Sequence, residues 1–143
     1  MSFTIANLKM IDPSALKAKL TSSVVQSPII IDVRDSDHIG GHIRNSHHIP
    51  STTIPNQCPK IYDLLKDSQT NEVVFHCALS QQRGPSSAMR FIRWLGDNKN
   101  DDPFAKSLEI YVLRGGFVKW QELYGSDTEV TDRYDKDLWK FGY

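Results

Sequence analysis

The chain of 143 residues is long enough to bury a hydrophobic core without disulfides, and its composition, 39% hydrophobic and 24% charged, is ordinary for a globular domain. Lysine plus arginine and aspartate plus glutamate number 17 each, so no overall charge draws the chain to nucleic acid or to a membrane surface. The two cysteines, Cys58 and Cys77, are too few for a disulfide framework or a structural zinc cluster. No apolar run is long enough to span a membrane and the first residues do not resemble a signal peptide, so we expect a cytoplasmic and also nuclear location.

Short apolar segments alternate with helical patterns through the first half of the chain. Residues 8–11 are expected to form a short strand, and Asp12-Pro13 then opens a helix that ends at 21–23. Residues 29–33 form a continuous run rich in β-branched side chains, which is typical of a central parallel strand buried on both faces. A further short strand is expected at 46–50, where a proline ends it.

The same alternation continues in the second half. The predicted elements are a helix over 55–67, a strand over 73–77, a helix over 85–95, a polar connection over 96–102, a strand over 109–113 and a helix from 116. The polar tail carries Leu138, Trp139 and Phe141, which we expect to hold it against the domain.

Strands that alternate with helices predict an α/β fold with a parallel sheet covered on both faces. We expect one domain over 1–143, with a core at about 8–124 and a tail at 125–143. In open sheets of this kind, ligands bind beyond the carboxyl ends of the strands. The loop that begins at Cys77 is expected at that edge.

The segment from Cys77 to Arg83 combines a nucleophile with an anion site. It joins a strand to a helix that opens with Gly84-Pro85. A loop wrapped at a helix N-terminus directs several backbone N–H groups into one small volume, which favours anions and the thiolate form of a cysteine. The planar guanidinium of Arg83 is suited to grip two oxygens of a tetrahedral oxyanion. The alternative is that Cys77 is a small buried hydrophobe at the end of a strand.

Other polar residues have structural interpretations. Asp32 and Arg34 are expected to hold the fold through an ion pair or loop hydrogen bonds. Four histidines lie close together in sequence, but their spacing fits no standard ligand pattern, so we predict no metal site for His38, His42, His47 and His48.

Several motifs resemble the rhodanese-like superfamily. In order they are Asp32-Val33-Arg34, Gly41-His42-Ile43, Ile49-Pro50, the cysteine loop, and residues 113–117 with Trp120. The loop HCALSQQRGP resembles the HC-x5-RGP signature of the cell-division-cycle twenty-five phosphatases and of related fungal arsenate reductases. Sulfurtransferases of the superfamily carry a loop one residue shorter. The resemblance covers about residues 8–120 and implies a central five-stranded parallel sheet.

The resemblance also implies roles for the loop. Cys77 would be the nucleophile and Arg83 the oxyanion clamp, both catalytic, and His76 a buried structural ring. The backbone amides that would bind the substrate are those of Ala78, Leu79, Ser80, Gln81, Gln82 and Arg83. Of these residues, Ser80 is best suited to hydrogen-bond the thiolate.

The chain departs from the phosphatases in two ways. Their loops carry acidic residues where this chain has Ala78 and Gln82, so a general acid within the loop is missing. Val33 replaces their back-door cysteine, which leaves Cys58 as the only other thiol. Cys58 could resolve an oxidised Cys77, but an incidental buried cysteine is the simpler interpretation.

The predicted function is a cysteine-dependent phosphatase that hydrolyses aryl or protein phosphoesters, of tyrosine or dual specificity, through a phosphocysteine intermediate. The alternatives are a thiol-dependent arsenate reductase and a non-catalytic phospho-ligand binding module. We expect a monomer without cofactor or metal, and a phosphorylated protein, a small aryl phosphate or another oxyanion as its partner.

Overall fold

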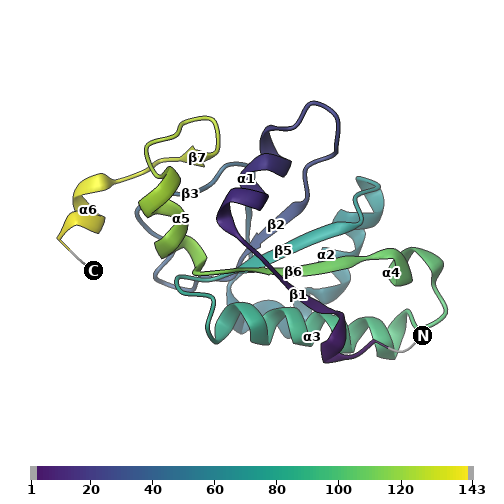
Figure 1. The fold of residues 1–143 in the computed structure, drawn as a ribbon. Helices are drawn as coiled ribbons and strands as arrows, with labels where there is room; N and C mark the ends of the chain where they lie inside the picture. Colours follow the sequence, from purple (N-terminus) through teal and green to yellow (C-terminus); the bar gives the residue numbers. More distant parts are fainter. Residues whose placement is uncertain (1–2, 142–143) are drawn as a thin grey trace.

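The computed structural model describes residues 3–141 and contains a five-stranded parallel sheet. The strands lie side by side in the order β1, β6, β5, β2, β4. Figure 1 labels the first four of them. The bounds of the five strands are Leu8–Ile11, Glu109–Leu113, Glu72–His76, Ile29–Asp32 and His47–His48. The predicted α/β fold with a five-stranded parallel sheet is therefore confirmed.

Helices cover both faces of the sheet (Figure 1). On one face lie α1 (Pro13–Thr21) and α5 (Gly116–Tyr124), where Leu16, Phe117 and Trp120 are fully buried. The other face carries α2 (Ile54–Asp67), α3 (Arg83–Asn98) and the short α4 (Pro103–Ser107). Two hydrophobic cores, one on each side of the sheet, thus hold the strands in place.

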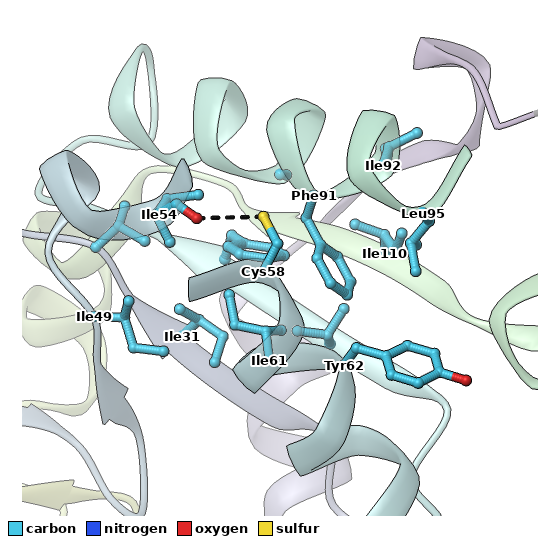
Figure 2. Packing of buried hydrophobic residues seen from close by; sticks show 14 of the residues in the cluster. Ile31, Ile49, Ile54, Cys58, Ile61, Tyr62, Phe91, Ile92, Leu95 and Ile110 are labelled. Atoms are coloured by element: carbon cyan, nitrogen blue, oxygen red, sulfur yellow. Dashed lines mark hydrogen bonds between the residues drawn. The ribbon is translucent and has the colours of Figure 1, made fainter. Parts of the chain in front are cut away.

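The core between the sheet and helices α2, α3 and α4 contains Cys58. Figure 2 shows it on α2 among apolar side chains, and its Sγ lies 3.3 Å from the carbonyl oxygen of Ile54. The residue is 1% exposed, and burial raises the pKa of its thiol to about 11. This environment favours the interpretation of Cys58 as a buried structural cysteine.

The register of β2 and β5 brings the carboxyl ends of the two central strands together. Asp32 pairs with His76, and the N–H of Val33 donates to the carbonyl oxygen of His76 at 2.8 Å. Cys77 therefore emerges beside the loop that follows β2. Side chains from both loops can meet at this edge of the sheet.

The helix α1 begins at Pro13, as predicted. Asp12 precedes α1 as expected, but its side chain caps no helical N–H and instead accepts from Nε of Arg114 at 2.8 Å.

The helix α3 begins at Arg83 and continues to Asn98, so the predicted polar connection is wrong over 96–98. Within the helix, Gly96 lies next to the backbone and side chain of Phe3. The helix α4 was not predicted, and Asp102 caps it by accepting from the N–H of Phe104 at 2.9 Å.

The tail forms two elements that the sequence did not predict. Strand β7 (Thr131–Asp132) pairs antiparallel with β3 (His42–Ile43), and α6 spans Lys136–Lys140. Trp139 holds the tail as expected, since its Nε1–H donates to the carbonyl of Gly40 at 2.9 Å. Phe141 does not, because it is 78% exposed. Short 3-10 turns lie at Ile5–Asn7 (η1) and Ser51–Thr53 (η2). Over residues 3–141, no helix is long and apolar enough to span a membrane.

Candidate active site

The cysteine loop lines a pocket at the carboxyl end of β5. The pocket has a volume of about 290 Å³, and its wall is formed by Cys77, Ala78, Leu79, Gln81, Gln82 and Arg83. Cys77 is only 3% exposed although it contributes to this wall. A nucleophile in such a place is shielded from bulk solvent yet borders a cavity large enough for a tetrahedral oxyanion.

One backbone donor of the loop contacts the sulfur. The N–H of Ser80 donates to Sγ of Cys77 at 3.2 Å, while the hydroxyl oxygen of Ser80 accepts from the N–H of Cys77 at 3.4 Å. Ser80 adopts a left-handed backbone with φ of 57°, which tightens the turn. Over residues 3–141, the N–H groups of Ala78, Leu79, Gln81 and Gln82 find no protein acceptor. The loop therefore offers unsatisfied donors next to its cysteine, which is the requirement for an anion cradle.

The carbonyl groups at the start of the loop point instead toward α5. The carbonyl of Cys77 accepts from the N–H of Phe117 at 3.0 Å, and that of Ala78 accepts from the N–H of Val118 at 2.9 Å. This approach requires a glycine, because a Cβ on Gly116 would lie 2.4 Å from the oxygen of Ala78. Helix α5 thus fixes the orientation of two loop peptides.

Arg83 lines the same pocket and is held by two carboxylates that follow β2. Its Nη1 donates to Asp37 at 2.8 Å and to Asp35 at 3.2 Å, and its Nη2 donates to Asp37 at 2.7 Å. The hydrogen bond from Arg83 lowers the pKa of Asp37 to about 2, and the same bond raises the pKa of Arg83 above its ordinary value. Partial burial would raise the pKa of Asp35, but hydrogen bonds from Ser51 and Arg83 outweigh it and leave the pKa lowered. Both carboxylates are therefore ionised near neutral pH.

His76 has the structural environment that was expected of it. The ring is completely buried, and its Nδ1–H donates to the carbonyl of Cys77 at 3.1 Å. Burial lowers the pKa of His76, so the neutral ring is favoured. Its Nε2 lies 3.7 Å from Asp32 and finds no hydrogen-bond partner in the described residues.

The predicted pairing of Asp32 with Arg34 is confirmed. Both side chains are fully buried, and Nη2 of Arg34 donates to Asp32 at 2.8 Å and to the carbonyl of Gly41 at 2.9 Å. Burial alone would raise the pKa of Asp32, but its His76, His38 and Arg34 neighbours hold it well below the usual range. The pair fixes the β2–β3 loop, which carries the carboxylates that contact Arg83.

The clustered histidines form a stack near this loop. The ring of His38 lies 3.8 Å from that of His48 and 5.8 Å from that of His42, measured between centroids. Nε2 of His48 donates to the carbonyl of Arg34 at 2.6 Å. Among the residues from 3 to 141, no three histidine, cysteine or acidic side chains are arranged to hold a metal ion.

The structure brings six of the predicted loop residues to one pocket, which Ser80 does not line, and it adds Asp35 and Asp37, which the sequence reasoning missed. The signal was present, because both carboxylates follow directly after a central strand. Parallel neighbours end at the same edge of a sheet, so these residues had to approach the Cys77 loop. Only the structure shows that they contact Arg83.

The sequence was compared with models of protein families and with known proteins, and both comparisons found similar proteins. A family model described as a rhodanese-like domain matches residues 12–123. The chain is 36% identical to the CDC25-like phosphatase YCH1 of Saccharomyces cerevisiae, over 97% of this chain and 99% of that protein.

Solved structures give the same family. The crystal structure of Saccharomyces cerevisiae Ygr203w, a homologue of single-domain rhodanese and the Cdc25 phosphatase catalytic domain, matches with a TM-score of 0.84 and 37% identity, over 96% of this chain and 95% of that one. An As-Sb reductase from Leishmania major matches with a TM-score of 0.71 and 31% identity, over 85% and 81% of the two chains. The chain therefore belongs to the rhodanese-like domain family, among relatives named as a phosphatase and as an As-Sb reductase.

Proposed function

We propose that the protein is a cysteine-dependent phosphatase acting on aryl or protein phosphoesters. The thiolate of Cys77 attacks phosphorus in line, forming an S–P bond as the ester P–O bond breaks and the leaving oxygen departs with the electron pair. Water then attacks the phosphocysteine, which releases inorganic phosphate and restores the thiolate. Arg83 and the loop amides stabilise the negative charge on the equatorial oxygens.

The observation that carries the proposal is the polarity of the Cys77 loop. The carbonyls of Cys77 and Ala78 are engaged by α5, whereas the N–H groups of Ala78, Leu79, Gln81 and Gln82 have no protein acceptor within residues 3–141. A loop with free donors around a cysteine binds an oxyanion better than a neutral ligand. The pocket volume of about 290 Å³ admits a phosphoryl group with part of its leaving group.

The carboxylates beside the pocket affect which leaving groups can be used. Asp35 and Asp37 are paired with Arg83 and have lowered pKa values, so neither is protonated at neutral pH. A general acid typically contributes about 10²–10⁴-fold to the departure of a poor leaving group. The enzyme should therefore hydrolyse aryl phosphates, whose phenolates need little protonation, far faster than alkyl phosphates.

Arsenate reduction is the second candidate, because the matched relatives include the Leishmania major As-Sb reductase. Arsenate has the charge and shape of phosphate. Cys77 would displace water from arsenate to form a thiol–arsenate adduct. An external thiol such as glutathione would then supply the electrons, and two thiols would become a disulfide as arsenic(V) becomes arsenic(III).

A paired assay tests these two functions. Purified wild-type protein is given an aryl phosphate in one series, and arsenate with glutathione in another, with Cys77→Ser as the control in both. The phosphatase proposal expects aryl phosphate turnover that is lost in Cys77→Ser. Arsenite formation without aryl phosphate turnover would favour the reductase, and oxyanion binding without either turnover would indicate a non-catalytic module.

A further inference from the structure

The guanidinium of Arg83 is held on one side only. Its five N–H groups comprise one on Nε, two on Nη1 and two on Nη2. Three hydrogen bonds to carboxylates use both Nη1–H groups and one Nη2–H group. Within residues 3–141, Nε donates to no protein acceptor. The Nε–H and the second Nη2–H are neighbours on the planar group and form a fork spaced for two oxygens.

The two carboxylates are themselves fixed. Asp35 accepts from the hydroxyl of Ser51 at 2.7 Å, and its own backbone N–H donates to Asp37 at 2.9 Å. The preceding residue, Arg34, is fully buried against Asp32 in the core. Asp35 and Asp37 thus sit on a loop that is tied to η2 on one side and to the sheet on the other.

We propose that Asp35 and Asp37 are positioning residues that orient Arg83 for oxyanion binding. They occupy three N–H groups and restrict a long side chain to one orientation, leaving the Nε–Nη2 fork for the bound oxyanion. The proposal deepens the proposed function, but it requires only that an oxyanion binds in the Cys77 pocket. Neither carboxylate touches the reacting atoms in this account.

Two effects of the carboxylates oppose each other. Their negative charge disfavours an anion in the pocket next to Arg83, which lowers affinity. Their hydrogen bonds remove the conformational freedom that Arg83 would otherwise lose on binding, which raises affinity. We expect orientation to dominate for Asp37, because it holds the guanidinium with two parallel hydrogen bonds at 2.8 and 2.7 Å.

The test measures tungstate binding by calorimetry, together with KM and kcat for an aryl phosphate. Asp37→Asn should raise the tungstate Kd roughly tenfold, equivalent to about 1.4 kcal/mol, with Asp35→Asn changing it less. Asp37→Glu, which keeps the charge, should recover part of the affinity. Asp12→Asn is the matched control, since it breaks the exposed Asp12–Arg114 pair and should leave both measurements unchanged.

A double-mutant cycle separates positioning from general stability. Because lysine has no planar fork, Asp37→Asn should have little further effect on tungstate binding once Arg83→Lys is present. An equal loss in both backgrounds, or unchanged or tighter tungstate binding by Asp37→Asn, would overturn the inference. A wild-type protein that binds tungstate but hydrolyses no aryl phosphate would instead refute the proposed phosphatase, and leave the tungstate comparison valid.

Discussion

Substitution of Gly116 by alanine probes how α5 supports the cysteine loop. Gly116 has a positive φ of 61°, and a Cβ there would lie 2.4 Å from the carbonyl oxygen of Ala78 and 2.6 Å from that of Cys77. Ordinary contacts begin at 3.4 Å, so the loop peptides must move by about 1 Å. The left-handed backbone adds a cost of about 1–2 kcal/mol for any residue with a Cβ.

The substitution should lower both the stability of the protein and its activity. We expect Gly116→Ala to lower the free energy of unfolding by about 1–3 kcal/mol in urea titrations, from backbone strain and the close contact. A displacement of about 1 Å at catalytic groups can cost on the order of 10²-fold in rate. The kcat/KM for an aryl phosphate should therefore fall by about that factor, and tungstate binding should weaken as the loop N–H groups turn away.

Gly115→Ala is the matched control. Gly115 also has a positive φ, of 80°, but a Cβ there would meet the side chain of Lys119 instead of the cysteine loop. This variant should lose stability while its tungstate affinity stays near that of the wild type. If Gly116→Ala lost only stability and bound tungstate normally, the loop would not depend on α5 and the reasoning would be refuted.

Three further predictions concern the core, the thiols and pH. Arg34→Met should lower the free energy of unfolding by about 3–5 kcal/mol in urea titrations, because it leaves buried Asp32 without its cationic partner; a change below 1 kcal/mol would contradict this role. Iodoacetamide at pH 8 should alkylate Cys77 but spare Cys58, whose thiol is buried with a pKa of about 11, as peptide mass mapping would show; early modification of Cys58 in folded protein would be the opposite result. The pKa of Asp37 is about 2 in the folded protein and near 4 in the unfolded chain, so its ionisation stabilises the fold above pH 4. This contribution of about 1–2 kcal/mol is lost as the pH falls from 4 toward 2. Wild type and Asp37→Asn should therefore converge in stability at pH 2, and a constant difference across that range would contradict the assignment.

The sequence predicted the sheet and the cysteine loop because both depend on local patterns. The apolar run of residues 29–33 and the strand before Cys77 carry the composition of buried parallel strands, and the spacing from Cys77 to Arg83 defines the loop. Local patterns also located the helix that contains Trp120. These elements needed no knowledge of which segments lie together.

The missed features depend on contacts between distant segments. Gly96 reads as a helix end, but it lies inside α3 with Phe3, a residue far away in the sequence, next to it. The tail reads as polar chain, yet β7 gains its pairing from β3. The pairing of Asp37 with Arg83 joins residues that are 46 positions apart, which no local pattern encodes.

The most direct test of the account is to look for phosphate on Cys77 during turnover. Wild-type protein is mixed with an aryl phosphate, quenched within milliseconds, and digested for mass mapping. The account predicts a phosphorylated peptide that contains Cys77, a burst of the phenol product, and loss of both in Cys77→Ser. Continued hydrolysis by Cys77→Ser, or steady turnover with phosphate found on another residue, would contradict it.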